Sequence, residues 1–188
     1  CVFVVCVCVR ESMQEDQAVG CYQQGIDLAR RIGDTSSEVN CMVNMVVACG
    51  ALGQLDKANE VGEQALALCR STNQKELEMA CLTNLVAAHK HAHQDGTWDH
   101  EKAIQMLERA VELAKEASDK AGEGKAYHGL AGVHSAMQNF RKANEFLEKD
   151  LAICTALGDT SGAASTNVSI ACNIMQSKGN VREAETRF

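Results

Sequence analysis

The sequence predicts an all-α fold, a solenoid of antiparallel helix pairs stacked side by side. The main observation is a repeat, because a charged residue shortly before an alanine that opens a helical run recurs along the chain. The five index alanines are separated by 40, 45, 40 and 41 residues, and they are Ala18, Ala58, Ala103, Ala143 and Ala184. Self-similarity at this period is typical of helical repeat proteins. Composition agrees, since the 188 residues contain no proline and only 4% aromatic residues, which suits closely packed helices.

Each repeat is predicted to be a pair of helices. Apolar residues lie eight, ten and eleven positions after the index alanine in each of the first four repeats. These are Ile26, Leu66, Val111 and Leu151, then Leu28, Leu68, Leu113 and Ile153, then Ala29, Cys69, Ala114 and Cys154. A second apolar series lies sixteen, thirteen and twelve positions before the index alanine, and its spacings of three and four place it on one helix face. These residues are Met42, Tyr127 and Val168, then Met45, Leu130 and Ala171, then Val46, Ala131 and Cys172. In the repeat that carries an insertion the equivalents are Leu82, Leu85 and Val86. Turn-forming residues at Gly33, Asn73, Ser118 and Gly158 end the helices.

Taken in order, the chain reads as one array over 1–188 and as a piece of a longer chain. The partial first unit, 1–35, begins with the apolar run CVFVVCVCV, which is either a native first helix or a truncated upstream segment. Two units, 36–76 and 121–161, are complete, and 77–120 is complete with an insertion at 89–100. The last unit, 162–188, is expected to reach a second helix near Ala184.

Charge and cysteine usage exclude several classes of function. The net charge is −7 without a basic run, which argues against nucleic acid, and the apolar run at the start is too short to span a membrane. Ten cysteines occur without a CxxC pair, and Cys69, Cys154 and Cys172 fall where the repeat calls for small buried residues. We therefore expect reduced thiols in a cytoplasmic protein. No cofactor motif or catalytic set is present, so we expect no enzyme activity.

The region GEGKAYHGLAGVH…NFRKANEFLEKDLAICTALGD carries a family resemblance. Small residues at Ala131 and Ala143, large ones at Tyr127, Leu130 and Leu147, and a closing Leu157-Gly158-Asp159 make it similar to tetratricopeptide repeats, most of all to the longer repeats of Pins/LGN-type adaptors and kinesin light chains. The resemblance implies a right-handed superhelix whose concave groove binds a protein or peptide. The chain departs from the family in lacking a terminal-turn proline, in Val46 and Val86 at positions usually occupied by smaller residues, and in the insertion.

First helices are expected to line the groove and to supply the binding residues. Asparagine amides can pair with both the donors and the acceptors of an extended peptide backbone, although they can also be solvated or tie neighbouring helices together. The resemblance implies that Asn44, Asn84 and Asn173 face the ligand, and Lys125 and His128 belong to the same lining. Of the five residues with which the chaperone-tail type of repeat domain grips a carboxylate, only Asn84 and Lys125 match, so that mode is not expected.

Two alternatives remain open at this stage. The insertion brings His89, His91, His93 and His100 together with Asp95 and Asp99, a set that could bind a metal ion or form a polar loop over which Trp98 folds back. No HExxH motif fixes the ligands. The other alternative is a regulatory or spacer region of a larger multidomain signalling protein. The preferred hypothesis is a non-catalytic scaffold that binds an extended or helical segment of a partner protein.

Overall fold

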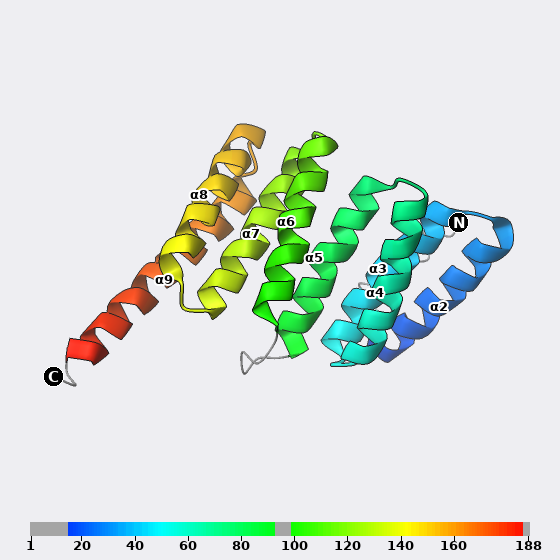
Figure 1. Ribbon diagram of the computed structural model, residues 1–188, viewed down its shortest axis with the longest axis horizontal. Helices are drawn as coiled ribbons and strands as arrows, with labels where there is room; N and C mark the ends of the chain where they lie inside the picture. Colours follow the sequence, from blue (N-terminus) through cyan, green and yellow to red (C-terminus); the bar gives the residue numbers. More distant parts are fainter. Residues whose placement is uncertain (1–14, 93–98, 186–188) are drawn as a thin grey trace. The chain divides into compact units, whose positions relative to one another are not determined.

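The computed structural model describes residues 15–92 and 99–185 of the chain (Figure 1). The described part consists of α-helices without a strand, which confirms the predicted all-α class. The helices are α2 (Glu15–Ile32), α3 (Thr35–Ala51), α4 (Leu55–Ser71), α5 (Lys75–Ala92), α6 (His100–Glu116), α7 (Lys120–Ala136), α8 (Phe140–Leu157) and α9 (Thr160–Glu185). The apolar run 1–9 lies outside the described residues. None of the described helices is long and apolar enough to cross a membrane.

The chain divides into two compact units, one from Cys1 to Trp98 and one from Asp99 to Phe188. In the first unit α3 packs against α2, α4 and α5, and α4 also packs against α5. In the second unit each helix packs against the next along the chain, α6 on α7, α7 on α8 and α8 on α9. Each unit is therefore a stack of helix pairs, as the repeat predicts (Figure 1).

Local chemistry sets the ends of the helices. The side chains of Asp34, Asp99, Asp119 and Asn139 accept hydrogen bonds from backbone N–H groups in the first turns of α3, α6, α7 and α8, as N-caps do. At the other ends the four predicted turn residues have positive φ, with values of 71° at Gly33, 54° at Asn73, 56° at Ser118 and 71° at Gly158. This left-handed conformation ends a helix and satisfies its last carbonyls. The helices therefore end at the residues that the sequence predicts.

The index alanines form part of the core. Ala58, Ala103 and Ala143 are 1%, 4% and 0% exposed, and Val46 and Val86 are buried despite their size. The close contact between α3 and α5 in the first unit depends on a glycine, Gly50. A Cβ placed on Gly50 would lie 2.5 Å from the Cβ of Ala88, so α3 and α5 approach each other through a residue without a side chain.

Some predicted core positions are exposed. Leu28 on α2 is 44% exposed, and Val168 on α9 is 62% exposed, while Ala171 and Cys172 are exposed as well. The expectation that Cys172 is buried is therefore wrong. A repeat offset marks a core position only where another helix covers that face, and α9 makes its main contact among the described helices with α8.

The end of the array also differs from expectation. A turn was predicted before a second helix near Ala184, but α9 runs without a break from Thr160 to Glu185. Gly179 does not interrupt it, since one glycine costs a helix only about 1 kcal/mol relative to alanine.

Candidate functional site

In the first unit the two predicted asparagines lie on neighbouring first helices. The Nδ2 group of Asn84 on α5 donates to the carbonyl of Val43 on α3 over 3.4 Å, and Nδ2 of Asn44 donates to the Asn40 carbonyl of its own helix over 2.9 Å. Both side chains are half-buried. Among the described residues neither Oδ1 atom accepts a hydrogen bond, so both amide oxygens remain available as acceptors.

The same arrangement extends along α3. Nδ2 of Asn40 donates to the carbonyl of Ser36 over 2.9 Å, in the geometry that Asn44 repeats one turn later. The side-chain N–H groups of Asn40 and Asn44 therefore both donate to backbone carbonyls of α3. The result is a short row of amide oxygens on α3, with Asn84 contributing another from α5.

In the second unit Lys125 and His128 line a pocket. Its volume is about 290 Å³, and it lies among the first half of α7, the last turns of α8 and the first half of α9. Lys125 is exposed, while the side chain of His128 is 41% exposed. The remaining lining residues are Ala121, Gly124, Asp150, Ile153, Cys154, Leu157, Asp159, Gly162, Ser165 and Thr166.

Asp150 is the polar centre of this pocket and is only 4% exposed. Its Oδ2 atom accepts a hydrogen bond from the Thr166 hydroxyl over 2.7 Å and lies 2.9 Å from Nδ1 of His128, which is the donor when Asp150 is ionised. The thiol of Cys154 donates to Oδ1 over 3.6 Å. Burial, followed by the charge of Asp150, raises the pKa of that thiol. Asp150 on α8 thus contacts side chains of both α7 and α9.

Sequence reasoning placed Thr166 in the lining of the groove but missed Asp150, although the repeat contains a signal for both. Seven residues after the index alanine the earlier repeats have Ala65 and Ala110, both fully buried, where Asp150 follows Ala143. The position of Thr166 is occupied in earlier repeats by small buried residues, namely Cys41, Cys81 and Ala126. Polar residues at two positions that are otherwise small and apolar indicate a local function.

Asn173 lies in the interior. It is 5% exposed, its Oδ1 accepts a hydrogen bond from the Ser135 hydroxyl over 2.8 Å, and its Nδ2 donates to Oδ1 of Asn144 over 2.9 Å. Both ends of the amide are therefore used to join α7, α8 and α9. This is the helix-tying role that the sequence left open for these asparagines.

The insertion offers little support for a metal site within the described residues. Nε2 of His89 lies 2.8 Å from Oδ1 of Asn59, and Asp99 accepts from the backbone of Lys102 as the N-cap of α6. In the described ranges 15–92 and 99–185 no group of three potential metal ligands is found. His93, Asp95 and Trp98 lie outside the described residues, as does the side chain of His91.

Comparison with known proteins shows which family the chain is similar to. Helix pairs repeated at about 40 residues define a helical repeat protein. Residues 78–156 match the family model described as tetratricopeptide repeat. Tetratricopeptide repeat protein 29 of Macaca fascicularis is 36% identical over 86 residues, and that of Homo sapiens is 34% identical over 86 residues. Each match covers 46% of this chain and 18% of the relative.

Solved structures share the fold. A putative kinesin light chain from Podosopora anserina with nearly identical TPR-like repeats has a TM-score of 0.70 at 21% identity, covering 98% of this chain and 89% of that one. BtubC from P. vanneervenii has a TM-score of 0.74 at 14% identity, covering 88% and 68%. A Rap protein complexed with Competence and Sporulation Factor has a TM-score of 0.72 at 14% identity, covering 89% and 45%. Residues 78–156 are therefore similar to tetratricopeptide repeats, and the described helices share the fold of such proteins, whose stacked helices form extended surfaces.

Proposed function

We propose that this chain is a non-catalytic scaffold that binds an extended or helical segment of a partner protein in a groove lined by its first helices. The observation that carries the proposal is the set of available amide oxygens at Asn44 and Asn84. Peptide backbones present N–H donors, and an amide oxygen on a rigid helix can accept from them without selecting a particular side chain.

The arrangement of the two amides reduces the cost of binding. Each is held by a hydrogen bond from its own Nδ2 group to a helix carbonyl, and each is half-buried. Side chains fixed before the ligand arrives lose little conformational entropy on association. In the proposed complex Asn44 and Asn84 hold the peptide backbone through Oδ1.

In the second unit Lys125 and His128 are the proposed binding residues, and both line the pocket around Asp150. Asn173 of α9 supports their placement indirectly, because it joins α9 to α7 through Ser135 and to α8 through Asn144. We place the protein in the cytoplasm, because most cysteines of the described residues are buried in the core, where they pack as small apolar side chains.

Selection from a displayed library of random linear peptides tests the proposal. Recovered peptides are titrated against the wild-type chain and against Asn44→Ala and Asn84→Ala. Loss of one hydrogen bond of about 1 kcal/mol predicts roughly fivefold weaker binding for each variant. Gln64→Ala is the control, since it removes an exposed amide from the second helix α4. Failure to recover any peptide, or equal affinity of the wild type and both asparagine variants, would overturn the proposal.

A further inference from the structure

We propose that the pocket around Asp150 receives one basic side chain, an arginine or a lysine, of the partner segment. This inference rests on the proposed function and specifies the chemistry that the second unit selects. It is argued from the origin of the pocket, from the partners of Asp150, and from the charges around it.

The pocket exists because one repeat lacks a side chain. Gly124 occupies the position at which the two earlier repeats have Val39 and Met79, both buried. A Cβ on Gly124 would lie 2.9 Å from Oδ1 of Asp150 and 3.3 Å from Cγ2 of Ile153. Glycine therefore leaves open the space beside the Asp150 carboxylate, which a larger residue would fill.

The carboxylate has an incomplete set of partners. Oδ2 has two, Thr166 and His128, but the partner of Oδ1 among the described residues is the Cys154 thiol at 3.6 Å. A thiol is a weak donor, and a carboxylate that is 96% buried is costly unless strong donors surround it. An entering ammonium or guanidinium group would supply the missing charge-assisted hydrogen bond to Oδ1.

The surroundings also favour a cation. Asp159 adds a second carboxylate to the lining, and it caps α9 by accepting from the backbone of Gly162 over 2.8 Å.

Two basic side chains also face the pocket. Lys125 is exposed at its edge, and His128 is already paired with Oδ2. Neither satisfies Oδ1. The aliphatic part of an arginine or lysine can pack against Ile153 and Leu157, as long basic side chains do on apolar surface. The net charge of −7 on the chain adds long-range attraction for a basic segment.

Titration with a small probe tests the pocket without the unknown partner. N-acetyl-arginine amide is added to the isotopically labelled full chain while backbone amide NMR signals are followed, with N-acetyl-citrulline amide as the uncharged analogue. We expect saturable shifts at Gly124, Gly162 and Thr166 with arginine, and at least about tenfold weaker binding of citrulline. Equal binding of the two probes, or shifts outside the pocket alone, would overturn the proposal.

Variants localise the interaction. Asp150→Asn should weaken arginine binding about tenfold. Asp56→Asn is the control, because it removes the same charge from an exposed position on α4, and it should leave arginine binding unchanged. Ser165→Lys tests the pocket independently if Asp150→Asn fails to fold, because it adds an ammonium group at an exposed lining position. It should abolish arginine binding, whereas Ser165→Gln should preserve it. Arginine binding that survives Ser165→Lys contradicts the assignment.

The two proposals fail differently. Displayed peptides that bind through Asn44 and Asn84 without a basic residue, and with the same affinity for Asp150→Asn, would refute the pocket but leave the scaffold. Arginine binding that depends on Asp150, without recovery of any peptide, would refute the scaffold and retain the pocket.

Discussion

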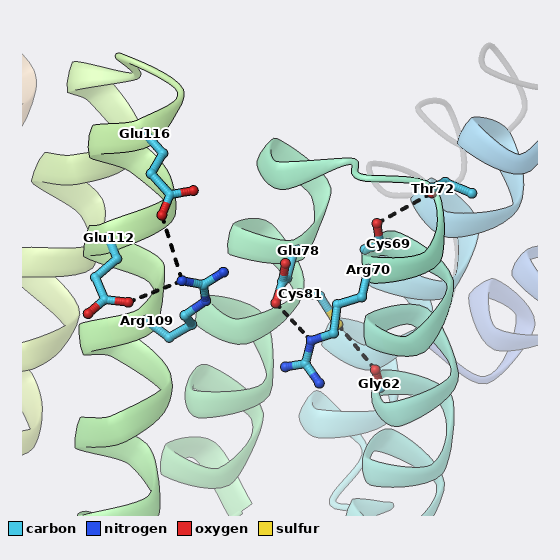
Figure 2. Close-up of polar contacts among 9 residues, drawn as sticks. All are labelled: Gly62, Cys69, Arg70, Thr72, Glu78, Cys81, Arg109, Glu112 and Glu116. Carbon is cyan, nitrogen blue, oxygen red and sulfur yellow. Dashed lines mark hydrogen bonds and ion pairs between the residues drawn. The ribbon is translucent and has the colours of Figure 1, made fainter.

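Nε of Arg70 lies 2.9 Å from Oε1 of Glu78, joining the last turn of α4 to the first turn of α5 (Figure 2). The relationship repeats one found 40 residues earlier, where Arg30 pairs with Glu38 over 2.7 Å between α2 and α3. Glu123 occupies the same position in the second unit and pairs with Lys120 over 2.7 Å. In each case an acidic side chain near a helix N-terminus, where the helix dipole favours it, also contacts a cation.

Replacing Arg70 should destabilise the first unit. Glu78 is only 5% exposed, so Arg70→Ala would remove the guanidinium that this buried carboxylate contacts, at a cost of about 1 to 2 kcal/mol. Chemical denaturation measures the change. Arg109→Ala is the matched control, because Arg109 pairs with the exposed Glu112 and Glu116 (Figure 2) and should change stability by less than about 0.5 kcal/mol. Equal losses in the two variants would contradict the special role of Glu78.

Gly50→Ala should lower stability although alanine favours helices. The new methyl group would lie 2.5 Å from Cβ and 2.7 Å from Cα of Ala88, so backbone has to move, at a cost of about 1 to 3 kcal/mol. Gly20→Ala is the control, since Gly20 lies within α2 with open space around it and should gain about 0.5 to 1 kcal/mol. Thermal unfolding of both variants should show shifts of opposite sign. A rise in melting temperature for Gly50→Ala would mean that α3 and α5 are not in close contact.

His134 should make stability depend on pH. It is 3% exposed, stacks on Phe146 with ring centroids 5.5 Å apart, and has a buried Nδ1 without a hydrogen-bond partner among the described residues. Burial first, and then the charge of Lys142, lower the pKa of His134 from its usual 6.5.

The unfolded chain therefore binds this proton more readily than the folded one. The contribution of neutral His134 to stability is complete above pH 6.5 and is lost as the pH falls below that value. Denaturation at neutral and mildly acidic pH should show this decline in the free energy of unfolding. The decline should be smaller in His134→Phe, because the contribution of His134 is then absent. An identical decline in the variant would assign the effect to other groups.

The buried thiols should react slowly. Burial is the first cause that raises the pKa of Cys81 to about 12 and that of Cys69 to about 11, and the Cys81 thiol donates to the carbonyl of Gly62 over 3.4 Å (Figure 2). Since the thiolate is the nucleophile, alkylation by iodoacetamide under native conditions should modify exposed Cys172 well before either of them. Mass spectrometry of digested protein gives the order. Early modification of Cys81 would show that the core of the first unit opens readily.

The sequence by itself determined the repeat, the helix pairs and the points at which helices end. Index alanines such as Ala58 and Ala143 are buried as predicted, and residues such as Asn73 and Ser118 adopt the positive φ of a helix terminus. These features follow from local chemistry and from a spacing that every repeat shares. The expected positions of Lys125 and His128 on a first helix also followed from the period.

Only the tertiary structure decided what lies opposite each side chain. It brought Asp150 of α8 to Thr166 of α9 beside the space left by Gly124, enclosed Asn173 between Ser135 and Asn144, and left Val168 exposed. A periodic pattern identifies which face of a helix is apolar, but not which helix covers that face or which polar atoms meet across it. Those depend on contacts between residues distant in sequence, and the pocket is built from such contacts.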